Sequence, residues 1–170
     1  AMLAATSLPT PERCRIAPAT ELGTTDLPIN RLRMLRARKL LARSSVDIDL
    51  QRLDAARSTI DDALHLAQEL SSPALEAESR LALGRVERAG HDRSAARTRL
   101  LRARELIQGQ SQHRALELRI LIQLIDVIGA EAEGLPQAQD LADEAKVLSQ
   151  ALGSPALLEA YLANNHARVL

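Results

Sequence analysis

The residues of this chain that could do chemistry are four histidines, one cysteine and a large excess of arginine over lysine. Asp61 and His65 lie four residues apart, as do His113 and Glu117, so each pair would share one face of a helix. Two ligands do not make a metal site, and pairs at this spacing commonly stabilise helix surfaces. We therefore expect no metal ion to be bound.

The remaining candidates for chemistry are isolated in the sequence. Cys14 has no histidine or aspartate in a catalytic arrangement around it, so we expect an inert thiol in a reducing cytoplasm. His91 and Asp92 are typical of a tight turn that caps a helix, and His166 is typical of polar packing near a helix end. The chain contains no phosphate-binding loop, dinucleotide-binding glycine pattern or nucleophile elbow. The sequence thus predicts neither an enzyme nor a cofactor.

The composition indicates the elements that position these residues. The 170 residues contain no Trp and no Phe, and Tyr161 is the only aromatic residue. Alanine and leucine, which favour helices, supply most of the apolar fraction, whereas the residues that strands prefer are scarce. This predicts an all-α protein. No apolar run approaches the roughly 18 to 20 residues of a membrane span, and the N-terminus lacks the layout of a signal peptide.

Helical periodicity begins after a proline-rich extension, which we assign to residues 1–28. A helical domain over residues 29–170 then follows, with Ser72 as the N-cap of its third helix and Pro73 at that helix's first position. Because the connections are short, consecutive helices are expected to pack antiparallel. The seven expected helices span residues 29–44, 50–70, 73–89, 92–108, 112–128, 136–152 and 154–170.

The helical domain contains an internal repeat. Residues 61–75 and 143–157 align without a gap, and nine of the fifteen positions are identical. A third copy lies between them, giving a period of 40 to 42 residues, or one helical hairpin per repeat. The columns that all three copies share are Ala56, Ala96 and Ala138; Ala63, Ala103 and Ala145; Leu66, Leu106 and Leu148; and Gln68, Gln108 and Gln150.

The spacing of Ala56, Ile60 and Ala63, repeated in the second copy, resembles the second helix of the tetratricopeptide repeat. Leu83-Gly84 precedes Ala96 by the interval at which a Leu-Gly pair occurs in that family, and Leu41-Ala42 precedes Ala56 with two extra loop residues. The chain departs from the family at its aromatic positions, which hold residues such as Arg80 and Glu87. Its period is also longer than the usual 34 or so residues. Longer repeats of this kind are similar to those of large bacterial signal-transducing regulators.

The resemblance implies a right-handed α-solenoid of about three and a half antiparallel helix pairs, since hairpins that cannot bury their apolar faces alone stack on one another. It also implies a concave surface lined by the first helix of each pair. Such surfaces bind extended peptides or partner helices. We therefore expect a protein- or peptide-binding scaffold, and alternatively an effector- or peptide-sensing segment of a larger transcriptional regulator.

Charge alternates along the chain with roughly the repeat period. Residues 29–44 carry six basic residues and no acid, and residues 45–79 carry eight acids against two arginines. Residues 80–119 carry ten arginines against four acids, and residues 120–170 carry seven acids against two bases. One hypothesis places neighbouring hairpins in mutual electrostatic register; another is an arginine-lined groove for carboxylates. Nucleic acid is disfavoured by a net charge of zero and by the missing aromatic residues.

The groove hypothesis names particular side chains. Aligning the first and third helices matches Arg38 and Arg43 with Arg80 and Arg85. The expected ligand is an acidic peptide or a peptide C-terminus. The candidate groove residues are Arg38, Arg43, Glu78, Arg85, Arg88 and Gln123.

The two ends of the chain suggest a fragment of a longer protein. Ala1-Met2 is typical of an expression scar before a start residue. The last expected helix leaves Leu158, Leu162 and Val169 on one side without the polar cap that usually finishes a solenoid. We expect further repeats after it, or a homodimer formed through this C-terminal helix.

Overall fold

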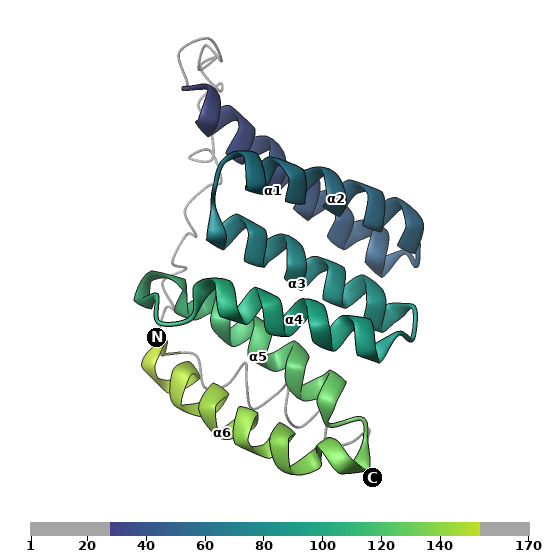
Figure 1. Cartoon of the computed structure of the whole chain (residues 1–170), viewed down its shortest axis with the longest axis vertical. Coiled ribbons are helices and arrows are strands. Elements are labelled where there is room, and N and C mark those ends of the chain that lie inside the picture. The colour runs from purple at the N-terminus through teal and green to yellow at the C-terminus, as the bar shows by residue number, and fades with distance from the viewer. Residues whose placement is uncertain (1–27, 154–170) are drawn as a thin grey trace, which may run out of the picture.

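The computed structural model describes residues 28–153, and over this range the chain is entirely helical (Figure 1). The expected all-α class is confirmed for these residues, which form six α-helices and two short 3₁₀ helices and contain no strand. The expected seventh helix, the extension before Pro28, Cys14, Tyr161 and His166 lie outside the described residues. The elements are α1 (Ile29–Asp49), α2 (Leu53–Glu69), α3 (Pro73–Ala89), α4 (Arg93–Ile107), η2 (Ser111–His113), α5 (Arg114–Ile128), η3 (Ala132–Gly134) and α6 (Leu135–Ala151).

The ends of α3 agree with the sequence prediction because local chemistry determines them. The Ser72 hydroxyl accepts a hydrogen bond from the Leu75 N–H at 3.5 Å, and Pro73 opens the helix. Asp92 caps α4 in the same way, accepting from the Ala95 N–H at 2.9 Å. In the turn between the two helices His91 adopts the left-handed conformation, with φ 64°, and Gly90 before it has φ −81°.

The predicted boundary between the first two helices is wrong. We expected the first helix to end at Ser44, but α1 continues to Asp49 and α2 begins only at Leu53. Ser44 is fully buried, and its hydroxyl donates to the Leu41 carbonyl one turn earlier at 2.8 Å, so it is satisfied within the helix. The chain turns instead at Gln51, with φ 58°.

This longer helix corrects the repeat register. The turn at Gln51 lies forty residues before the turn at His91. The two turns also close alike, because the backbone N–H of Arg52 donates to the Asp47 carbonyl at 2.8 Å and the backbone N–H of Asp92 donates to the Glu87 carbonyl at 2.9 Å. The first two hairpins therefore repeat every forty residues, without the two extra loop residues that we expected. In this register Arg38 corresponds to Glu78 and Arg43 to Leu83, rather than to Arg80 and Arg85 as the sequence alignment had them.

The helices stack in chain order, each packed against the next (Figure 1). Further contacts join α1 to α3 and α3 to α5, so the odd-numbered helices form one continuous layer. The repeated alanines are buried where helices cross: Ala56, Ala63, Ala96, Ala103 and Ala145 are fully inaccessible, and Ala138 is nearly so. Small side chains allow this close approach, and Ile60 and Leu100 fill the space between them.

Gly84 shows how close two of these helices come. A Cβ at this position would lie 2.8 Å from Cγ and 2.9 Å from Cδ2 of Leu100 on α4. Only glycine leaves room for that fully buried leucine. The Leu-Gly pair that carried the family resemblance thus has a packing role between α3 and α4.

Candidate functional site

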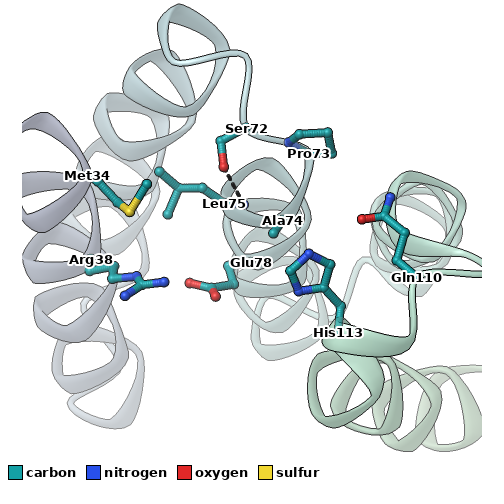
Figure 2. A pocket seen from close by; sticks show the side chains of 9 residues that line it. All are labelled: Met34, Arg38, Ser72, Pro73, Ala74, Leu75, Glu78, Gln110 and His113. Carbon is teal, nitrogen blue, oxygen red and sulfur yellow. Dashed lines mark hydrogen bonds between the residues drawn. The ribbon is translucent and has the colours of Figure 1, made fainter. Parts of the chain in front are cut away.

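A cleft opens where the odd-numbered helices meet, between α1, α3 and the segment that leads into α5 (Figure 2). Its volume is about 270 Å³. The first turn of α3 forms one side, because Ser72 and Pro73 start the helix there. The residues that line the cleft are Met34, Arg38, Ser72, Pro73, Ala74, Leu75, Glu78, Gln110 and His113.

Two of the predicted groove residues meet in this cleft. Figure 2 shows Arg38 of α1 and Glu78 of α3 pointing toward one another from opposite walls. Within the described residues, no acidic group lies within 4.0 Å of the Arg38 guanidinium, and no basic group lies within 4.0 Å of the Glu78 carboxylate. The cleft therefore presents one cation and one anion that are both available to a ligand.

The apolar part of the cleft lies beside this charged pair. Met34 is 36% exposed and its side chain points toward Leu75, which is buried (Figure 2). His113, at the end of η2, faces the cleft from the side of α5, together with Gln110. From the sequence, His113 was expected to form a helix-surface pair with Glu117 and was not among the predicted groove residues. Its position depends on the 3₁₀ turn before α5, which spacing does not reveal.

The structure places Arg85 and Arg88 outside this cleft and pairs them with acids of neighbouring helices. Arg85 reaches α1, where its guanidinium lies 3.1 Å from the Ser45 hydroxyl and 3.5 Å from the Asp49 carboxylate. Arg88 reaches α5 and pairs with Asp126. Both arginines thus connect successive odd-numbered helices, and their charge is largely neutralised where they lie.

The last two predicted groove residues are also outside the cleft. Arg43 lies on the exposed side of α1, 3.9 Å from Asp47 one turn along the same helix. Gln123 lies on α5 three residues before Asp126, and its side-chain oxygen is buried without a hydrogen-bond partner in the described structure. The structure therefore brings together Arg38 and Glu78 but not the other four residues.

An acid that the sequence did not single out recurs near the end of each odd-numbered helix. Asp47, Glu87 and Asp126 each lie two residues before the end of their helix, and the first two are buried. Arg57 of α2 donates two hydrogen bonds of 2.7 Å to Glu87, which holds the pKa of that carboxyl below its ordinary value against the opposing effect of burial. In the sequence, the alternation of acidic and basic blocks was the pattern that could have indicated these acids and their arginine partners.

These contacts support the hypothesis that neighbouring hairpins lie in electrostatic register. The pairs join α2 with α3, α3 with α1, and α3 with α5, and Arg104 of α4 pairs with Glu144 of α6, forty residues away. Arg97 donates to the Gln137 side chain at the same separation, at 3.0 Å. Five arginines therefore join one helix to another within the described residues: Arg57, Arg85, Arg88, Arg97 and Arg104.

A second hollow, of about 380 Å³, lies over α4 and includes three arginines. Arg80 pairs with Glu76 and Arg102 with Glu105, each within its own helix. Two of its three arginines are thus engaged by acids of their own helices, whereas Arg38 has no acid within 4.0 Å among the described residues. We therefore take the cleft at Arg38 and Glu78 as the candidate site.

The histidines form no catalytic arrangement in the described structure. His65 lies 3.2 Å from Glu69, on the following turn, rather than pairing with Asp61. Across residues 28–153 no three histidine, cysteine or acidic side chains gather in a way that could hold a metal ion. None of the helices in that range combines the length and apolar character of a membrane span.

Comparison of the chain with protein-family models, with curated proteins and with solved structures finds no match.

Proposed function

We propose that this chain is a tetratricopeptide-like solenoid module that binds a peptide segment of a partner protein along α1, α3 and α5. The observation that carries the proposal is the cleft in which Arg38 and Glu78 face each other beside an apolar surface, neither having an ion-pair partner among residues 28–153. A continuous layer of odd-numbered helices extends the surface on either side of it. In a solenoid this layer would be the concave side.

The chemistry of the cleft suits a peptide that carries a carboxylate. Arg38 would donate to a ligand carboxylate, either an acidic side chain or a C-terminus, because the guanidinium fork matches its two oxygens. Glu78 would accept hydrogen bonds from backbone N–H groups of the same peptide. Met34 and Leu75 would contact an apolar side chain of the ligand.

The size of the cleft favours an anchor point over a site for a whole effector molecule. Its volume of about 270 Å³ is close to the lower end of the roughly 300 to 1,000 Å³ of typical small-molecule pockets. One side chain or a chain terminus fills a space of this size. The rest of the peptide would lie on the exposed surface of the helices. This favours a scaffold over the effector-sensing alternative.

The experiment is a selection of peptides with free C-termini against the whole chain, followed by anisotropy titration of the enriched peptides. We expect Arg38→Glu to weaken their binding at least about tenfold, since a favourable charge contact becomes a repulsive one. The matched control is Arg93→Glu, an exposed charge reversal at the start of α4. Equal affinity of wild type and Arg38→Glu for every enriched peptide would refute the proposal.

A further inference from the structure

The outer face of α1 carries an apolar stripe that no described helix covers. Leu32 and Leu35 form one exposed apolar pair and Val46 and Leu50 a second on the same face, and the four are 37%, 50%, 56% and 55% exposed. The eleven residues from Leu35 to Val46 are three helical turns, and Lys39 and Arg43 lie on this face between the two pairs. Helices α2 and α3 pack against the opposite side of α1. The stripe is therefore separate from the cleft that contains Arg38 and Glu78.

The residues of α3 that correspond to this face of α1 are packed against other helices. In the forty-residue register, Leu35 corresponds to Leu75 and Val46 to Val86, with the same residue type in both cases, whereas Leu32 and Leu50 correspond to Ser72 and Gly90 at the two ends of α3. On α3 these residues are 3% and 1% exposed, because they pack against α1 and α2. On α3 this face is covered by the preceding hairpin. On α1 the equivalent face is not covered by any described helix.

Asp47 is a second sign of a missing neighbour. It corresponds to Glu87, whose two oxygens are both held by Arg57 from the preceding helix. Asp47 is buried, yet its Oδ2 has no hydrogen-bond partner in the described structure, and its nearest cations, Arg43 and Arg52, are 3.9 and 4.0 Å away. A buried carboxylate oxygen without a donor is costly. An arginine placed as Arg57 is placed on α2 would satisfy it.

The charges around the stripe define the kind of helix that fits. Arg31, Arg36, Lys39 and Arg43 are exposed; Lys39 and Arg43 lie between the two apolar pairs and the other two beside them, and residues 29–44 contain no acid. The helix that covers the equivalent face of α3 is α2, which combines buried alanines with Asp54, Asp61, Asp62 and Glu69. Acidic flanks of this kind would complement the basic border of α1.

We propose that the outer face of α1 docks an acidic amphipathic helix of a partner protein, with a stripe of small apolar residues and an arginine near its N-terminus that pairs with Asp47. The docked helix would continue the stack as α2 does against α3. This surface is distinct from the peptide cleft, so the partner engaged here need not be the ligand bound there.

The test uses a fluorescent synthetic peptide with the sequence of residues 52–72, which includes α2, titrated into the whole chain. We expect saturable binding that Val46→Asp weakens at least about tenfold. The matched control is Val147→Asp on α6, where the valine is 68% exposed, and it should leave the affinity unchanged. Since both valines are exposed, both variants should melt like the wild type by circular dichroism, so that lost binding cannot be attributed to unfolding.

A second peptide, in which the residue corresponding to Arg57 is alanine, tests the role of Asp47. It should bind about threefold to tenfold more weakly, and equal affinity would remove Asp47 from the interface. Absence of saturable binding, or binding that Val46→Asp leaves unchanged, would overturn the docking proposal. Two further results would overturn it if no peptide binds. Loss of binding to anionic phospholipid vesicles in Val46→Asp would indicate a membrane surface as the occupant, and loss of concentration-dependent self-association would indicate a second copy of the chain. Arg38→Glu should leave this binding intact, which separates the two proposals.

Discussion

Arg57 of α2 and Glu87 of α3 form a bidentate ion pair, with two N–H···O distances of 2.7 Å, at the junction of the first two hairpins. The Glu87 side chain is only 8% exposed, whereas that of Arg57 is 42% exposed. The carboxylate therefore depends on this one guanidinium, while the guanidinium retains contact with water. A pair of this kind fixes how one hairpin is set against the next.

Removing the arginine should destabilise the fold. We expect Arg57→Ala to lower the free energy of unfolding by about 1 to 3 kcal/mol, because Glu87 is left buried without its donors; the exposure of Arg57 keeps the effect below that of a fully buried pair. Urea titration followed by circular dichroism measures it. The matched control is Arg102→Ala, which removes a pair with Glu105 within one exposed helix face and should leave the midpoint unchanged. Equal midpoints for the two variants would contradict this role for Glu87.

The same pair predicts a dependence on pH. Because the hydrogen bonds from Arg57 lower the pKa of Glu87 in the folded protein, the pair contributes its full stability above the ordinary glutamate pKa of about 4.5. That contribution is lost as the pH falls through the lowered pKa of the folded state. Glu87→Gln should therefore show a shallower loss of thermal stability than the wild type below about pH 4.5. If the melting temperatures of Glu87→Gln and the wild type fall by the same amount from pH 6 to pH 3, the pair does not contribute this pH dependence.

Gly84 gives a prediction about packing. Gly84→Ala adds a methyl group where Leu100 already lies 2.8 Å away, so we expect a loss of about 1 to 3 kcal/mol despite alanine's better helix propensity. Gly90→Ala is the matched control, since its nearest neighbours would be 3.5 Å away and its φ is −81°. Chemical denaturation of both variants compares them. If Gly84→Ala is as stable as Gly90→Ala, α3 and α4 do not approach as closely as described.

The sequence predicted the helical class and the bounds of α3 well, because these depend on local signals. Ser72, Pro73 and Asp92 act within a few residues of themselves, and the alanine columns report the crossing of helices directly. The border between α1 and α2 was predicted wrongly because Ser44 was interpreted as a helix end. In the structure Ser44 is buried inside α1, and its hydroxyl donates a hydrogen bond to the Leu41 carbonyl.

The candidate site was harder to predict, because the availability of each arginine depends on partners about forty residues away. The sequence does not distinguish Arg85 and Arg88 from Arg38. In the structure, however, Arg85 pairs with Asp49 of α1, and Arg88 pairs with Asp126 of α5. Arg38 faces Glu78 across the cleft but has no acid within 4.0 Å among the described residues. The two-residue error in the repeat register aligned Arg38 with Arg80, which pairs with Glu76, instead of with Glu78.

The most direct test of the peptide-binding account is an NMR titration of the ¹⁵N-labelled whole chain with a selected peptide. The account predicts the largest amide shift changes at Met34, Ala74, Leu75 and His113, which surround the cleft from α1, α3 and the start of α5. It predicts small changes along α2, α4 and α6. Shift changes concentrated on those even-numbered helices, with the residues of the cleft unaffected, would contradict it.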